Sequence, residues 1–104
     1  MSSPRQGEVW WAEAEDKRRP VLVVTRSDAC PVLARLVVAP VTRTVRGIPT
    51  EIALGEDVGL PAECAASFDN LQPVNQKLLT ARLGRLNDER AHELCRALAA
   101  LGDC

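Results

Sequence analysis

Short segments rich in β-branched residues, each bounded by turn residues, make up most of this 104-residue chain. The run Pro20–Thr25 (PVLVVT) is almost continuously apolar, which is typical of a strand that is buried on both faces. Further strands are expected at Gly7–Glu13, Val32–Ala39, Thr50–Leu54, Cys64–Phe68 and Leu79–Leu83. Several short strands at such close spacing predict a small closed or half-closed β barrel.

Only the end of the chain has a helical period. Asn87 is a suitable N-cap, and Asp88 and Glu89 follow in the first turn, where the helix dipole favours carboxylates. The apolar positions then recur at steps of three and four, at Ala91, Leu94, Cys95, Leu98 and Leu101. We therefore expect a mainly β fold, a small barrel of five to seven strands, with an appended helix at 87–101 packed on it by its leucines.

The length and the N-terminus predict one soluble domain spanning residues 1–104. No apolar run approaches the roughly 18 residues that a membrane-spanning helix needs. The segment Met1–Trp11 lacks a long apolar stretch with a cleavage site, so no signal peptide is expected. The sequence thus predicts a cytoplasmic protein with no membrane contact.

The four cysteines and the single histidine are too scattered to predict a metal site. Cys30, Cys64, Cys95 and Cys104 include no CxxC pair, and His92 lies off the apolar stripe of the expected helix. A zinc site needs clustered sulfur and nitrogen ligands. We therefore expect reduced thiols, a surface histidine, no metal and no cofactor.

The net charge of −1 conceals a strongly basic middle segment. Residues 17–46 carry seven basic and one acidic side chain, whereas residues 1–16 and 47–104 are both net acidic. A local cluster of positive charge can form an anion-binding face on a chain that is nearly neutral overall. Charge alone also fits solvated surface arginines, so it does not decide for nucleic acid.

Trp10 and Trp11 are adjacent within the first expected strand. Neighbouring strand residues point to opposite faces, so one ring can enter the core and the other is left for solvent, a covering loop or a partner.

An ordered set of motifs gives the sequence its specificity. GEVWWAE at 7–13 is followed by RRPVLVV at 18–24, VAPVTRTVRGIPTEI at 38–52, DNLQ at 69–72, LGRL at 83–86 and the closing helix. This order, over nearly the whole chain, resembles the MazF/PemK family of toxin endoribonucleases.

The resemblance implies an SH3-like barrel of the CcdB/PemK type, a homodimer and an RNA groove across the dimer face. It implies sequence-specific, metal-independent cleavage of single-stranded RNA, in which the 2′-hydroxyl attacks the phosphorus and leaves a 2′,3′-cyclic phosphate and a 5′-hydroxyl. By motif match, the catalytic residues are Arg19 in RRP and Thr42 in APVT.

The residue types fit that chemistry. One histidine on a helix cannot supply both a general acid and a general base, so stabilisation of the phosphorane is the main contribution left. The guanidinium of Arg19 offers forked donors to phosphate oxygens, where charge develops in the transition state. The hydroxyl of Thr42 can hold a phosphate oxygen or orient the 2′-hydroxyl.

Supporting RNA contacts are expected around these two residues. Lys17 and Arg18 precede Arg19, while Arg43, Thr44 and Arg46 follow Thr42 in a loop. Such side chains contact phosphates, which position RNA without reading its sequence. The amides of Asn70 and Gln72 suit base edges, although Asn70 could instead cap a turn.

One departure from the family pattern affects the active site. The link between the first two strands is only Ala14–Arg18, whereas many members have a longer loop with a Gly-Ser-Glu segment. Glu15 or Asp16 could replace the loop glutamate.

The expected partners follow from the resemblance. They are single-stranded RNA, a second copy of the chain, and a MazE-like antitoxin whose tail lies in the RNA groove, with operator DNA bound only through the antitoxin complex. Two alternatives stay open at this point, a CcdB-like toxin that binds DNA gyrase without catalysis and an SH3-like binding module.

Overall fold

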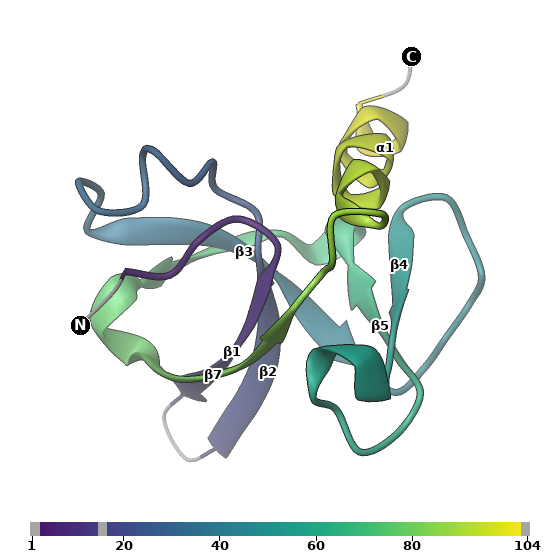
Figure 1. The fold of residues 1–104 in the computed structure, drawn as a ribbon, viewed down its shortest axis with the longest axis horizontal. Coiled ribbons are helices and arrows are strands. Elements are labelled where there is room, and N and C mark those ends of the chain that lie inside the picture. Colours follow the sequence, from purple (N-terminus) through teal and green to yellow (C-terminus); the bar gives the residue numbers. More distant parts are fainter. Residues whose placement is uncertain (1–2, 15–16, 103–104) are drawn as a thin grey trace.

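Seven antiparallel strands and one C-terminal helix form the molecule in the computed structural model, which describes residues 3–14 and 17–102 (Figure 1). The strands are β1 (Glu8–Ala14), β2 (Lys17–Val23), β3 (Arg35–Thr42), β4 (Glu51–Leu54), β5 (Cys64–Ser67), β6 (Gln72–Asn75) and β7 (Leu79–Arg85). Three short 3₁₀ helices, η1 (Glu56–Val58), η2 (Phe68–Asn70) and η3 (Gln76–Leu78), link them, and α1 covers Ala91–Leu101. The expected half-closed barrel with a C-terminal helix is confirmed.

Strand β3 organises the sheet because its partners change along its length. The strand order is β4-β5-β3-β2-β1-β7, and β6 pairs with the first half of β3. The β2–β3 ladder runs from Val23 opposite Val38 to Val21 opposite Pro40. From Val41 onward, β3 instead pairs with β5. The two parts of the sheet therefore diverge directly after Pro40.

Two apolar clusters fill the two sides of this bent sheet. The larger lies beneath α1 and is built around the fully buried Phe68 together with Leu22, Ile52 and Leu94. The smaller contains Val21, Val23, Leu36 and Val38, with Trp10 packed against it. Leu22 thus faces one cluster while Val21 and Val23 face the other, which confirms that this strand is buried on both faces.

Several predicted boundaries were wrong. β2 begins at Lys17 instead of Pro20 and ends at Val23, because pairing with β1 extends through its three basic residues. β3 covers Arg35–Thr42 instead of Val32–Ala39, since Pro31–Ala34 form a turn and a bend. β6 was missed, because QPVN contains a proline and has no run of apolar residues.

The helix begins at Ala91, four residues later than predicted. Asn87 caps the preceding turn instead, where its side-chain oxygen accepts a hydrogen bond of 3.0 Å from the Arg90 amide. The apolar stripe was also partly wrong. Leu94 and Ala97 are buried and Leu98 is half-buried, whereas Ala91, Cys95 and Leu101 are exposed.

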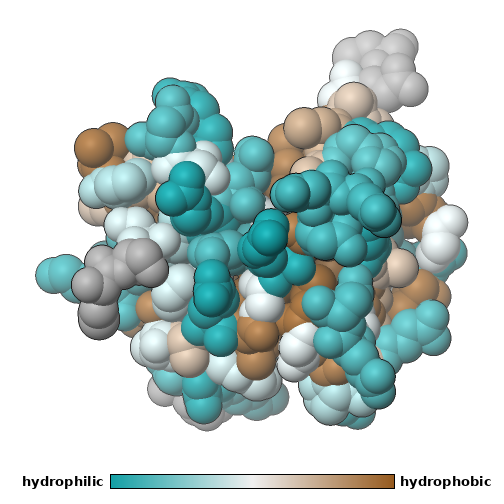
Figure 2. All heavy atoms as spheres, viewed as in Figure 1, coloured by the Kyte–Doolittle hydropathy of each residue, from teal (hydrophilic) through white to brown (hydrophobic). Residues whose placement is uncertain are grey.

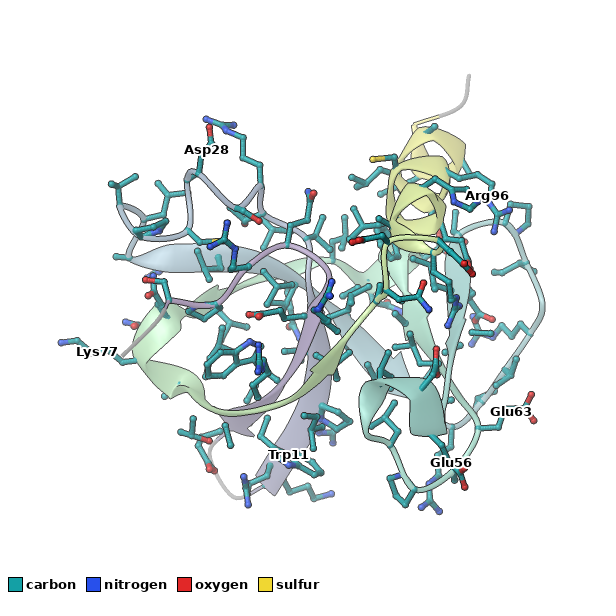
Figure 3. The ribbon with its side chains drawn as sticks, viewed as in Figure 1. Trp11, Asp28, Glu56, Glu63, Lys77 and Arg96 are labelled. Carbon is teal, nitrogen blue, oxygen red and sulfur yellow. The ribbon has the colours of Figure 1, made fainter. Side chains whose placement is uncertain are left out.

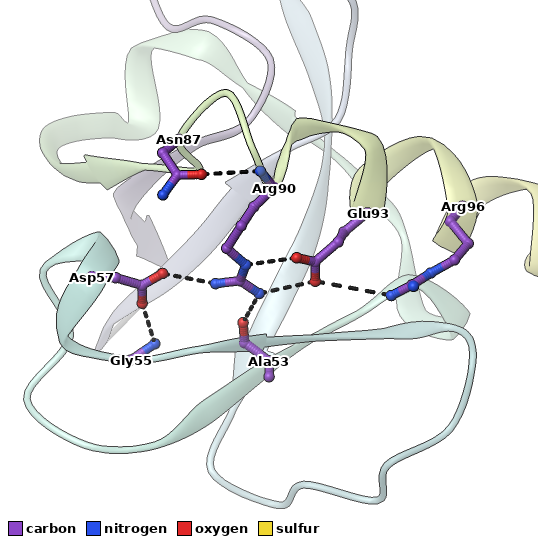
Figure 4. A network of polar contacts seen from close by, with 7 residues as sticks. All are labelled: Ala53, Gly55, Asp57, Asn87, Arg90, Glu93 and Arg96. Atoms are coloured by element: carbon purple, nitrogen blue, oxygen red, sulfur yellow. Dashed lines mark hydrogen bonds and ion pairs between the residues drawn. The ribbon is translucent and has the colours of Figure 1, made fainter.

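Arg90 anchors the start of the helix to the sheet (Figure 4). Its guanidinium donates to Glu93 on α1, to Asp57 on η1 and to the carbonyl oxygen of Ala53 on β4. The Arg90–Asp57 and Arg90–Glu93 ion pairs both measure 2.7 Å, and the Arg90 side chain is only 23% exposed. One side chain therefore fixes the helix to two other elements.

Two glycines allow η1 to lie directly on β7. A Cβ at Gly84 would fall 2.5 Å from the carbonyl oxygen of Val58, and a Cβ at Gly59 would clash with the carbonyl oxygen of Leu83. Gly59 also has a φ of 85°, which favours glycine. The backbones therefore meet with no room for side chains.

Both tryptophans are half-buried, and Trp10 is the one that packs against an apolar cluster of the core. The described cysteines, Cys30, Cys64 and Cys95, are free thiols as predicted, and the two buried ones are Cys30 and Cys64. Cys104 lies outside the described residues. Within 3–14 and 17–102, no helix is long and apolar enough to cross a membrane.

Candidate functional site

A groove of about 710 Å³ opens between the β1–β2 hairpin and β6. Its apolar wall includes Val21, Pro40 and Val74. Its polar side chains come from four strands and are Glu13, Arg19, Arg35, Gln72 and Asn75. Figure 2 shows one face of the molecule, on which hydrophilic side chains predominate and smaller apolar areas lie between them.

Arg19 enters this groove from β2. It pairs with Ala12 of β1, and strand alternation puts its side chain on the same face as the buried Val21. Its guanidinium has no ion pair or hydrogen bond to any other residue within 3–14 and 17–102. No described residue therefore occupies the five N–H donors of Arg19.

Thr42 ends β3, two residues beyond Pro40, the last residue of this strand that pairs with β2. Thr42 itself pairs with Ala65 of β5, and it is not among the residues that line the groove. The Thr42 hydroxyl oxygen accepts a hydrogen bond of 3.1 Å from the Thr44 amide. That bond fixes the hydroxyl at the point where β3 ends and leaves its proton free to be donated.

Lys17 and Arg18 are exposed on β2, but only Lys17 shares the face of Arg19. Arg18 faces the other way. Its Nε lies 3.3 Å from Oε1 of Glu13, and its guanidinium carbon lies 4.9 Å from the ring centre of Trp11 (Figure 3 labels Trp11). Arg18 does not itself line the groove, although its ion-pair partner Glu13 does.

The loop after Thr42 is as exposed as the sequence suggested. Arg43, Thr44 and Arg46 all lie in it, and none of them lines the groove. Glu51 holds the loop by accepting hydrogen bonds from the backbone amides of Arg46 and Gly47. The side chains of Arg43, Thr44 and Arg46 are thus exposed in the loop that directly follows Thr42.

Gln72 and Asn70 are placed differently. Gln72 lies opposite Val38, lines the groove and is exposed. Asn70 closes η2, where its amide nitrogen donates to the hydroxyl of Ser67 at 2.9 Å, and it does not line the groove. The turn-capping alternative for Asn70 thus fits its geometry.

Sequence reasoning missed three polar residues of the groove, Glu13, Arg35 and Asn75. Arg35 and Asn75 face each other across the β3–β6 ladder, so finding them required β6. Glu13 contributes the one carboxylate among the groove-lining residues of the described chain. Its Oε1 already contacts Arg18 and the Thr80 hydroxyl, both at 3.3 Å.

Other acid–base groups lie away from the groove or outside the described residues. His92 is exposed on α1, as predicted. Glu15 and Asp16, which could replace the family's loop glutamate, lie outside the described residues. In the segments 3–14 and 17–102, no group of three or more histidines, cysteines and carboxylates could hold a metal ion.

Comparison with known proteins decides the family. Residues 5–102 match the model of the PemK-like, MazF-like toxins of type II toxin–antitoxin systems. The chain belongs to this family. Among the MazF relatives, the probable endoribonuclease MazF5 of Mycobacterium tuberculosis is 45% identical over 104 residues, which cover 97% of this chain and 94% of the relative. The probable endoribonuclease MazF2 of the same species is 36% identical over 96% of this chain and 99% of its own length.

Solved MazF structures have the same fold. The Mycobacterium tuberculosis toxin MazF-mt6 superposes with a TM-score of 0.85 at 34% identity, covering 92% of this chain and 96% of its own. An endoribonuclease in complex with its cognate antitoxin, from a mycobacterial species, superposes with a TM-score of 0.81 at 25% identity, over 95% and 94% of the two chains. The expected family, barrel fold and MazF-type endoribonuclease function are thereby confirmed, and the gyrase-binding and module alternatives are not favoured.

Proposed function

We propose that this MazF-type toxin cleaves single-stranded RNA at specific sequences without a metal ion, with Arg19 and Thr42 as its catalytic residues. The observation that carries the proposal is the guanidinium of Arg19, which has no partner among the described residues and lines a groove together with Gln72. The relatives' names support RNA as the substrate, since they are called endoribonucleases.

The reaction is a transesterification within the RNA. The 2′-oxygen forms a bond to phosphorus, the bond from phosphorus to the 5′-oxygen breaks, and the leaving oxygen takes up a proton while the 2′-hydroxyl loses one. Negative charge builds on the non-bridging oxygens in between. Arg19 stabilises that charge with two parallel N–H bonds, and Thr42 donates its hydroxyl proton to a phosphate oxygen.

The remaining basic residues place the RNA. Lys17, on the same face of β2 as Arg19, contacts phosphates. Phosphates are also contacted by the loop after Thr42, through Arg43, Thr44 and Arg46, while Gln72 contacts base edges. Arg18 and Asn70 contribute less in this proposal, because both are engaged elsewhere in the protein.

The proposed partners use the same surface. We expect a homodimer that joins two basic segments, and an antitoxin tail that covers the groove and excludes RNA. The relative solved with its cognate antitoxin supports the antitoxin part. In this proposal the toxin acts in the cytoplasm, and operator DNA is bound only by the toxin–antitoxin complex.

The test is incubation of the purified protein with end-labelled single-stranded RNA in excess EDTA. Cleavage at a few defined sites, giving 2′,3′-cyclic phosphate and 5′-hydroxyl ends, is the expected result. Intact RNA under these conditions, or ends bearing a 5′-phosphate, would contradict the proposal.

A further inference from the structure

A second groove of about 930 Å³ lies beside the first. Its lining includes Trp10, Leu33, Asn75, Lys77 and Arg82. We infer that it binds nucleotides of the same RNA that flank the cut, with Trp10 stacking on a base and Lys77 and Arg82 contacting phosphates. This inference rests on the proposed function, since it extends the same substrate beyond the cleavage groove.

The two grooves adjoin at Asn75, which lines both of them. Of the η3 turn that follows, Leu78 lines the first groove, whereas Gln76 and Lys77 line the second. We therefore expect an extended RNA strand that leaves the Arg19 groove past Asn75 to reach the second groove.

Trp10 is held in one orientation, as a stacking surface must be. Its indole nitrogen donates a hydrogen bond of 3.0 Å to Oε1 of Glu8, and its ring packs against the smaller apolar cluster. Glu8 is only 5% exposed. Its other oxygen accepts a bond of 3.0 Å from Arg82. One buried carboxylate thus positions both the ring and a cation of this groove.

The charge of the second groove favours an anionic occupant. The described lining contains Lys77 and Arg82 and no Asp or Glu. Within 3–14 and 17–102, the Lys77 ammonium has no ion pair, and the Arg82 side chain is 57% exposed despite its bond to Glu8. Cations around a fixed aromatic ring are the combination that single-stranded nucleic acid binders use. An acidic peptide would use the cations but not the stacking face, so RNA fits better.

The test compares RNAs of different length on the intact protein. The core RNA spans the mapped cut site. It is used in its all-ribose form to measure cleavage, and with a 2′-deoxy nucleotide at the cut site to measure binding without cleavage. Two longer probes add four nucleotides on the 5′ or the 3′ side. We expect one extension to tighten binding at least about fivefold, the lower end for stacking one base on an aromatic ring. An abasic nucleotide at one added position should remove that gain.

Two variants that each remove one positive charge show whether the added nucleotides bind in the second groove. For the longer RNA, Lys77→Gln should reduce the slope of log affinity against log salt by about 0.7, the value for one lost contact to a single strand. Arg96→Gln is the control, because this exposed arginine lies on α1, far from Lys77 (Figure 3). Both variants should cleave the core RNA like the parent protein.

Any of three results would overturn the inference. The first is that neither extension tightens binding, and the second is that Lys77→Gln behaves like Arg96→Gln on the longer RNA. The third is that Lys77→Gln weakens the binding of the antitoxin but not that of RNA. If the parent protein neither binds nor cleaves the core RNA, the proposed function itself fails and this inference fails with it. Normal cleavage of the core RNA without a length effect rejects only the second groove.

Discussion

Arg19 on β2 and Thr42 on β3 each lie two residues beyond Val21 and Pro40, the last pair between these two strands. β3 has by then turned to pair with β5, where Thr42 lies opposite Ala65. We propose that a phosphate of the RNA contacts both side chains where the two strands part. The first three predictions test this arrangement.

Replacing Arg19 by alanine should lower the rate of RNA cleavage at least about a hundredfold, the effect of removing one donor that stabilises a developing oxyanion. The melting temperature should hardly change, because the guanidinium is exposed and has no described partner. Arg19→Lys should restore little activity, since an ammonium cannot make two parallel bonds. Arg26→Ala is the control, because Arg26 is also exposed and pairs only with Asp28. Full activity of Arg19→Ala in a single-turnover assay would show that the site is elsewhere.

Thr42→Ala should also slow cleavage, while Thr42→Ser should retain most of the activity because it keeps the hydroxyl. The alanine variant also loses the hydrogen bond from the Thr44 amide. That loss should cost at most about 1 kcal/mol of unfolding free energy, as the bond is exposed. Urea denaturation separates this stability effect from the rate. Equal rates for Ala and Ser would mean that the hydroxyl takes no part in catalysis.

Removing the 2′-hydroxyl at the cut site should stop cleavage there completely, because the nucleophile is lost. Excess EDTA should leave the rate on normal RNA unchanged. Both are measured with the same labelled oligonucleotide, and normal RNA without EDTA is the reference. Cleavage of the deoxy substrate, or a rate that recovers only with added metal, points to water as the nucleophile.

Two copies of the basic segment should make RNA binding by the dimer strongly dependent on salt, because bound phosphates release counterions. Light scattering should give about twice the 11.3 kDa of one chain. A saturating amount of antitoxin should displace uncleavable RNA. The model of a shared groove is wrong if both bind together or if the toxin is monomeric at micromolar concentration.

Arg90→Ala should lower the unfolding free energy by about 1–3 kcal/mol, since it removes charged hydrogen bonds at a side chain that is mostly covered. The hydrogen bond from Arg90 holds the pKa of Glu93 below its usual range. Glu93 therefore adds to the unfolding free energy at pH values above its unfolded pKa of about 4.3. This contribution is lost as the pH falls through the lower pKa of Glu93 in the folded protein. Arg90→Ala should flatten the dependence of unfolding free energy on pH in this acid range. Arg96→Ala, with its longer 3.9 Å contact to Glu93, is the control.

The sequence predicted the order of most strands because their β-branched runs and turns are local signals. Motifs predicted Arg19 and Thr42 as catalytic residues, and of these Arg19 lines the groove. The sequence missed Arg35 and Asn75 because their proximity depends on the pairing of β6 with β3, and QPVN carries no strand signal. Arg18 and Arg19 look equivalent in the sequence. Only strand alternation, once the register is known, sends them to opposite faces.

Gly59 and Gly84 bring η1 and β7 into backbone contact, which bears on how the chain can vary in length. A residue inserted or deleted in the 55–60 segment would move Gly59 away from Leu83. A residue with a side chain would then meet the Leu83 backbone. The exposed loop at 43–50 has no such constraint, since a Cβ at Gly47 would meet no atom within 4 Å. Relatives that recognise different RNA sequences should therefore differ in length in this loop, while η1 keeps its length.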